Sequence, residues 1–155
     1  LPVFFAILAL SFGAASLTNA SLVMKFGMYS LSLWSACTFT GVALLGWVAL
    51  QTVLSEPPLW GFMAGLMLTF FCQGLMFGNL SAMAMQPLGH IAGVGASVVG
   101  ALSMLVSLPA AYVIAQAFNG TVLPLVTGYA VFGAAVVTTM LWTKRGTPSV
   151  EKGFS

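Results

Sequence analysis

Residues 57–143, more than half of the chain, contain no Lys, Arg, Asp or Glu. A soluble domain is usually about one-quarter charged, because water must solvate its surface. In this chain of 155 residues only 4% are charged and 60% are hydrophobic, and the mean hydropathy is +1.08. We therefore predict that lipid surrounds the chain. The composition excludes a disordered chain or a secreted disulfide scaffold, and a net charge of +2 gives no reason to expect a nucleic-acid partner.

Four breaks divide the apolar sequence into lengths that suit a bilayer. A hydrocarbon core of about 30 Å requires about 20 helical residues. The breaks contain charged residues, glycine or proline and lie at residues 25–30, 55–58, 86–90 and 119–120. We expect an all-α integral membrane bundle over residues 1–145, with five transmembrane helices at about 2–24, 31–54, 59–85, 91–118 and 121–143. Residues 146–155 are expected to form a cytoplasmic tail.

The basic residues predict one orientation. Lys25 lies between the first two spans, whereas Lys144, Arg145 and Lys152 follow the fifth, so all four belong on one side of the membrane. Loops rich in Lys and Arg favour the cytoplasmic side. We therefore expect the carboxyl-terminal end in the cytoplasm, with the amino-terminal end and Glu56 outside.

Small residues recur at spacings that favour close helix contacts. Lipid tails are as apolar as leucine, so helices in a bilayer associate through close packing and polar contacts. We predict such packing at Gly61 and Gly65, Gly74 and Gly78, and along a face of the fourth span formed by Gly93, Ser97, Gly100, Met104 and Ser107. A substrate path is the alternative for that face. Pro109 removes a backbone donor inside the same span, which predicts a kink that can act as a hinge.

Gln73 is the clearest polar group at membrane depth. An unsatisfied amide in hydrocarbon costs several kcal/mol, so it must face protein or water. Phe70 and Phe77 lie three residues before and four residues after it on the third span. With Ser103 and Ser107 of the fourth span, these residues are our candidates for a cavity that holds an amphipathic molecule. An interhelical hydrogen bond is the alternative for Gln73.

The sequence lacks the motifs of catalytic and metal sites. It has no His-Glu-x-x-His, no Gly-x-Ser-x-Gly and no paired carboxylates, so we expect neither catalysis nor a cofactor or metal. Cys37 and Cys72 are interpreted as buried apolar side chains, and His90 as a turn residue. For Asn19 and Asn79 a structural contact is the favoured interpretation.

The turn between the third and fourth spans resembles a known transporter family. Residues 78–93 read Gly-Asn-Leu-Ser-Ala-Met-Ala-Met-Gln-Pro-Leu-Gly-His-Ile-Ala-Gly, and residues 94–100 read Val-Gly-Ala-Ser-Val-Val-Gly. The segment is similar to the drug-efflux branch of the major facilitator superfamily, the Bcr/CflA (bicyclomycin-resistance) group. The matching positions are Asn79, Ala82, Pro87, Gly89, His90, Ala92, Gly93 and Gly100. Where relatives commonly read Ala-Gly-Thr-Ala-Ser, this chain reads Ala-Gly-Val-Gly-Ala, which moves the hydroxyl to Ser97.

The resemblance implies a fold and a function. The five spans would be helices 8–12 of a twelve-helix transporter in a bacterial inner membrane, and the missing amino-terminal half would be a partner from the same chain. The odd number of spans and the opening at Leu1 point the same way. The implied activity is proton-coupled efflux of drugs or other amphipathic molecules by alternating access, with the cavity lined by the first, third and fourth spans. Two alternatives remain, a small membrane subunit without transport activity of its own and a transporter of another solute such as a sugar or metabolite.

Overall fold

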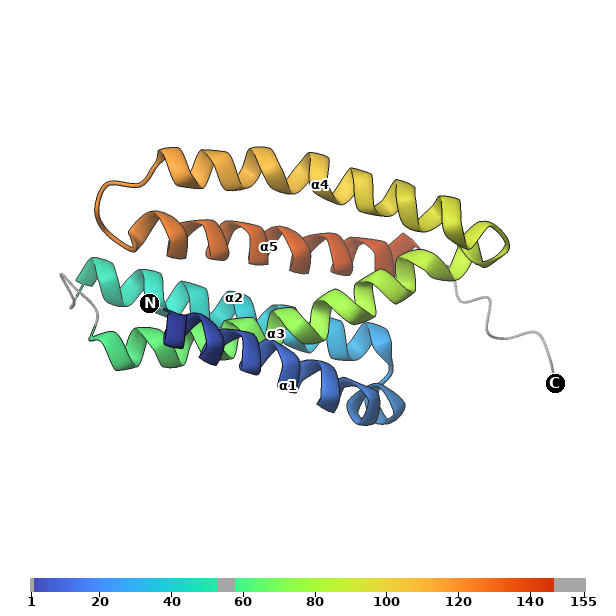
Figure 1. Ribbon diagram of the computed structural model, residues 1–155, viewed down its shortest axis with the longest axis horizontal. Coiled ribbons are helices and arrows are strands. Elements are labelled where there is room, and N and C mark those ends of the chain that lie inside the picture. The colour runs from blue at the N-terminus through green and yellow to red at the C-terminus, as the bar shows by residue number, and fades with distance from the viewer. Residues whose placement is uncertain (1, 53–57, 147–155) are drawn as a thin grey trace.

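The computed structural model describes residues 2–52 and 58–146. This part of the chain forms five α-helices, α1 (Pro2–Phe26), α2 (Met28–Thr52), α3 (Leu59–Met85), α4 (Ala92–Gln116) and α5 (Leu123–Gly146), and the short 3-10 helix η1 (Gln86–Ile91) joins α3 to α4 (Figure 1). No strand occurs among the described residues. The predicted all-α fold is therefore confirmed, and the helix bounds lie within a few residues of the expected spans.

Four helical stretches of the described chain are long and apolar enough to cross a membrane. Three are single helices, α1, α2 and α5, and the fourth is the stretch Leu59–Gln116, which contains α3, η1 and α4. The chain is therefore compatible with a multi-pass membrane protein.

Glycine and proline set the connections between the helices. Gly27 has φ +77° between α1 and α2, and Gly120 has φ +85° between α4 and α5, a backbone conformation that other residues rarely adopt. The Asn119 side-chain oxygen accepts hydrogen bonds from the Thr121 backbone N–H (3.2 Å) and hydroxyl (2.7 Å), which fixes the second turn. The expected break at residues 86–90 is the 3-10 helix η1, with proline in its first turn.

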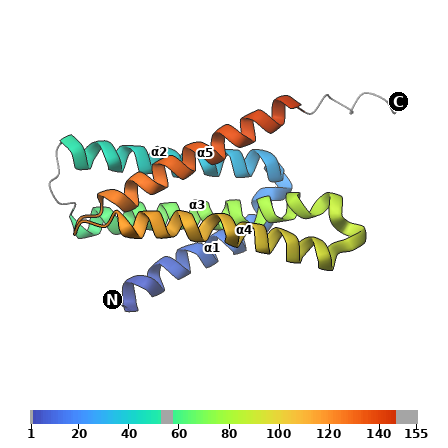
Figure 2. The ribbon, with the colours of Figure 1, turned by 90° about the horizontal axis from the view of Figure 1, so that it is seen from above.

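The helices form a packed body and one outlying helix. Helix α2 lies between α3 and α5, and α1 packs against α3. Helix α4 contacts α3 and α5 only sparsely, and Gly95 is its single buried residue, although all of its residues are described. Figure 1 shows α4 beside α5 at the upper edge, and Figure 2 views the molecule from that side.

Close approaches within the packed body depend on two glycines. A Cβ atom added at Gly74 of α3 would lie 2.8 Å from the Ala15 Cβ atom and 3.0 Å from the Phe12 backbone oxygen of α1. A Cβ atom added at Gly133 of α5 would lie 2.5 Å from the Thr40 hydroxyl oxygen of α2. A larger side chain at Gly74 would have to displace the α1 backbone, and one at Gly133 would have to displace the Thr40 and Phe39 side chains.

The other predicted packing residues are less crowded. A Cβ atom added at Gly78 would lie 3.8 Å from the Asn19 side chain, and one added at Gly61 would lie 3.4 Å from the nearby Pro58 ring. One added at Gly65 would meet nothing within 4 Å.

Most of the predicted face of α4 meets no other helix of the described chain, whereas its last residue, Ser107, lines the space between α4 and the helices beside it. The residues of that face are all exposed, and an added Cβ atom would meet nothing within 4 Å at Gly93 or Gly100. The Ser97 hydroxyl donates to the Gly93 carbonyl of its own helix at 3.0 Å. Other residues of α4 make its contacts with the neighbouring helices. Gly95 packs against the Leu88 side chain of η1, and Ile114 packs against Gly128 of α5.

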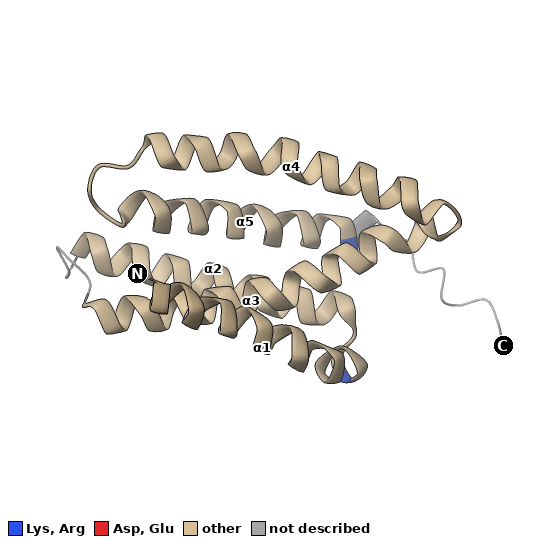
Figure 3. Cartoon of the chain, in the orientation of Figure 1, with Lys and Arg blue, Asp and Glu red and all other residues tan. Residues whose placement is uncertain are grey.

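The basic residues that the structure describes lie at one end of the bundle (Figure 3). Lys25 is in the last turn of α1, only four residues before Tyr29 of α2. The Lys144 Nζ atom lies 5.9 Å from the centroid of the Tyr29 ring, and the Tyr29 hydroxyl donates to the Met140 backbone oxygen of α5 at 2.6 Å. The predictions that involve Glu56, Lys152 and the tail beyond residue 146 fall outside the described residues.

Candidate functional site

A cavity of about 630 Å³ lies between α4 and the packed body. We call it the α4 cavity and define it by Phe39 of α2, Gln73 of α3, Ser103 and Ser107 of α4, and Tyr129 and Phe132 of α5. Aliphatic side chains of α4, among them Ile114, line the remainder. Its volume falls in the range of ordinary small-molecule sites, roughly 300–1,000 Å³.

The structure brings together three of the five predicted cavity residues. Gln73, Ser103 and Ser107 all line the α4 cavity. Phe70 is half-buried and Phe77 is 67% exposed, and neither lines it. At 100° per residue, positions three before and four after Gln73 both lie on the same side of it, displaced by about 50° around the helix. The α4 cavity lies on the Gln73 side of α3, and neither phenylalanine is among its lining residues.

The polar groups of the α4 cavity are uncharged. The Gln73 amide makes no hydrogen bond with any described residue, so it can both donate to and accept from a solute. The Ser103 hydroxyl donates to the Val99 carbonyl at 2.8 Å and the Ser107 hydroxyl to the Met104 carbonyl at 3.4 Å. Each serine oxygen therefore remains an acceptor. No Lys, Arg, Asp or Glu of the described part of the chain lines the cavity.

Aromatic residues form the wall opposite α4. The Phe39 and Tyr129 ring centroids are 5.5 Å apart at an interplanar angle of 53°, and Phe132 is one helical turn from Tyr129. Sequence reasoning missed these three residues because it expected the second and fifth spans to be peripheral. The only signal in the sequence was the pair Tyr129 and Phe132, three residues apart on α5. Such a pair is just as typical of ordinary helix packing as of a binding site.

A neighbouring cavity of about 580 Å³ lies between the carboxyl-terminal half of α4 and the amino-terminal half of α5. Pro109 lines it from α4 and Pro124 from the first turn of α5, and it shares Phe132 and Ile114 with the α4 cavity. Helix α4 continues through Pro109 as one element. Pro109 thus lines this cavity, and its action as a hinge stays a prediction.

Among the described residues, the other candidate side chains either pair with a structural partner or lack the arrangement of a metal or catalytic site. The Asn79 amide donates to the Asn19 side-chain oxygen at 2.8 Å, and the Asn19 amide donates back at 3.3 Å. Cys72 is buried, but Cys37 is exposed, contrary to expectation, because an apolar side chain can face lipid at little cost. Across the described residues no three His, Cys, Asp or Glu side chains gather as metal ligands would.

Comparison with known proteins finds no match to this chain among family models, curated proteins or solved structures. The chemistry of the α4 cavity is therefore the main ground for assigning a function.

Proposed function

We propose that the chain is part of a membrane transporter that exports drugs or other amphipathic small molecules, and that the α4 cavity binds the solute. The observation that carries this proposal is an open cavity of about 630 Å³ between apolar helices, lined by aromatic side chains and by the Gln73 amide, which pairs with no described residue. Aromatic and aliphatic walls favour the apolar part of such a solute, and the amide and the two serine oxygens favour a neutral polar group.

Five membrane crossings fit the path of the chain better than four. The stretch Leu59–Gln116 has 58 residues, which would extend about 87 Å as a straight helix, nearly three times the thickness of the hydrocarbon core. The chain reverses direction at η1 (Figure 1), so α3 and α4 would cross separately. The end that carries Lys25 and Lys144 would face the cytoplasm of a bacterial cell.

The loose attachment of α4 supports a transport cycle. A helix with one buried residue and cavities on its inner side can shift with little loss of packing. The resemblance of residues 78–100 to the Bcr/CflA group favours alternating access, in which an amino-terminal half of the same protein supplies the other wall. The acidic groups that couple export to proton entry would belong to that half.

An export assay with matched variants tests this proposal. The complete gene is expressed in a bacterial host that lacks its own exporters, and dye accumulation and drug tolerance are measured. We expect Gln73→Ala to change the relative export of different compounds, because it removes the only unpaired amide from the cavity. Phe77→Ala is the control on the same helix, and we expect it to leave export unchanged, since Phe77 does not line the cavity. A wild-type gene that changes neither accumulation nor tolerance would overturn the proposal.

The exposed face of α4 favours a second candidate, a membrane subunit that packs against a partner without transporting anything itself. Gly93, Ser97 and Gly100 leave that face smooth enough for another helix to approach closely. This candidate predicts that Gly100→Leu abolishes a stoichiometric complex while the complete gene confers no export. Export by the wild-type protein alone would exclude it.

A further inference from the structure

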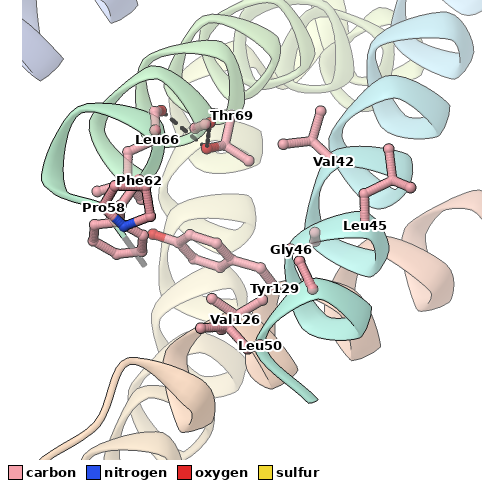
Figure 4. Close-up of a pocket in the computed structure, with 14 residues that line it drawn as sticks. Val42, Leu45, Gly46, Leu50, Pro58, Phe62, Leu66, Thr69, Val126 and Tyr129 are labelled. Atoms are coloured by element: carbon pink, nitrogen blue, oxygen red, sulfur yellow. Dashed lines mark hydrogen bonds between the residues drawn. The ribbon is translucent and has the colours of Figure 1, made fainter. Parts of the chain in front are cut away.

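A third cavity, of about 360 Å³, lies between α2, α3 and α5 (Figure 4). We call it the α2–α3–α5 cavity. It is lined by Val42 and Gly46 of α2, Gly65 and Leu66 of α3, and Val126 and Tyr129 of α5, among other small or aliphatic residues. No charged side chain from residues 2–52 or 58–146 lines it, and none of Gln73, Ser103 and Ser107 belongs to it.

Two glycines leave this cavity open. A Cβ atom added at Gly65 would meet nothing within 4 Å, and one added at Gly46 would meet only the Val126 side chain, at 3.6 Å. Gly74, nine residues further along α3, is crowded by α1 at 2.8 Å. An apolar cavity of roughly 150 Å³ can hold benzene, so the α2–α3–α5 cavity has room for a molecule with one or two rings.

One hydroxyl in the cavity has no partner among the residues that the structure describes. The Thr69 hydroxyl donates to the carbonyl oxygens of Gly65 (2.6 Å) and Leu66 (2.9 Å) on its own helix. The Tyr129 hydroxyl, by contrast, makes no hydrogen bond with any residue that the structure describes. Figure 4 shows the Tyr129 ring extending from α5 with its oxygen directed toward Phe62 of α3 and toward Pro58, which immediately precedes α3. A half-buried phenol among apolar side chains normally finds an acceptor.

We propose that the α2–α3–α5 cavity binds an uncharged lipophilic compound of one or two rings that carries one hydrogen-bond acceptor, and that the Tyr129 hydroxyl donates to that acceptor. The apolar lining excludes a charged ligand, because nothing in the cavity would replace its hydration. A lipid acyl chain would fill the space but leave the hydroxyl unpaired. The bilayer delivers such compounds directly, since Leu45 on the rim is 73% exposed.

This site does not depend on the proposed export function. It shares only Tyr129 with the α4 cavity, and its occupancy can be measured on protein that transports nothing. Gly65 is therefore the preferred position for a variant, because a side chain added there enters the α2–α3–α5 cavity alone.

Benzophenone is a suitable probe, because its carbonyl is the acceptor and also forms a covalent bond to nearby C–H groups under near-ultraviolet light. The full-length protein in lipid nanodiscs is illuminated with increasing benzophenone, and mass spectrometry locates the label. We expect saturable labelling of α2 and α3 residues that line the cavity, with Gly65→Leu reducing it about tenfold by filling the space. Gly100→Leu adds the same side chain on the exposed face of α4 and is the matched control, with no expected change.

A second comparison isolates the hydroxyl. Diphenylmethane has the same two rings without the carbonyl, so it should compete about threefold to tenfold more weakly than unlabelled benzophenone in the wild-type protein. In Tyr129→Phe, which keeps the ring, the two competitors should be equally effective. Equal competition in the wild-type protein would overturn the assignment of Tyr129 as the donor.

Two further results would overturn the site itself. One is labelling spread over the lipid-facing helices and unaffected by Gly65→Leu. The other is cavity labelling that appears in detergent but disappears in nanodiscs, which would assign the cavity to a lipid acyl chain. Labelling as expected in a protein that exports nothing would support the site and count only against the proposed function.

Discussion

Two neighbours of helix α3, α1 and α4, contact it in different ways. Toward α1 it has Gly74, where the backbones approach too closely for a Cβ atom, and Asn79, whose amide exchanges hydrogen bonds with Asn19. Toward α4 it has Gln73, which lines a cavity of about 630 Å³. One interface is closed by packing and paired amides, whereas the other leaves room for a solute.

The difference shows what holds helices together in lipid. Apolar side chains gain little by leaving lipid for protein, so burial alone does not attach a helix. The α1–α3 interface has both close packing and paired amides, and α4 has neither along its predicted small-residue face. A few residues therefore decide how closely a helix packs against its neighbours, even though the helices have similar compositions.

The largest expected effect comes from Gly74→Leu. The added side chain would have to displace Ala15 and the Phe12 backbone of α1, so we expect a loss of about 3 kcal/mol in the free energy of unfolding. Thermal unfolding of the purified full-length protein in detergent measures it. Gly100→Leu is the matched control on α4 and should change stability by less than about 0.5 kcal/mol. Equal losses at the two positions would contradict the distinction between the interfaces.

A double-mutant cycle on the amide pair sharpens the description of the α1–α3 interface. Asn79→Ala leaves the Asn19 amide unpaired, and we expect it to cost about 1–2 kcal/mol. The double variant with Asn19→Ala should cost less than the sum of the single changes, with a coupling of about 1 kcal/mol. Urea or thermal unfolding of all four proteins supplies the cycle, and strict additivity would show that the amides do not stabilise each other.

Tyr29→Phe tests the polar contact between α2 and α5. It removes the hydrogen bond to the Met140 backbone oxygen but keeps the ring beside Lys144, so the expected loss is about 1 kcal/mol. The same unfolding measurement detects it. Thr38→Val removes a hydroxyl that bonds within α2 itself and serves as the comparison, with a smaller expected change.

The smallest effect is expected on the open face of α4. Ser97→Ala removes a hydroxyl that bonds only within its own helix, so stability should change by less than about 0.5 kcal/mol. A loss above 1 kcal/mol, measured in the same way, would mean that this face packs against a second chain in the purified protein.

Local chemistry made part of this molecule predictable. Gly27 and Gly120 were expected in turns, and each adopts a positive φ that glycine tolerates. Gln73 was chosen for its depth in the third span and grouped with Ser103 and Ser107 of the fourth. These three line one cavity because α3 and α4 are antiparallel neighbours joined by a short connection, whereas Phe70 and Phe77, which were added from their spacing, do not line it. Each of these predictions needed only spacing along one helix or across one turn.

Contacts between distant spans were not predictable in the same way. Phe39, Tyr129 and Phe132 complete the cavity wall although nothing in their spacing distinguishes them from lipid-facing aromatics. Gly65 and Gly74 occupy similar motifs, but the first opens into a cavity and the second meets Ala15. The rotation of each helix about its axis decides such differences, and uniformly apolar helices contain little information about that rotation.

The sequence by itself determined that the chain is helical and apolar and where its helices begin and end, because backbone polar groups in lipid must be satisfied within each helix. Only the tertiary structure decided which faces close and which remain open, at Gly74 and around Gln73 in particular. Helix association in lipid depends on the fit between specific surfaces, and that fit exists only once two helices have met.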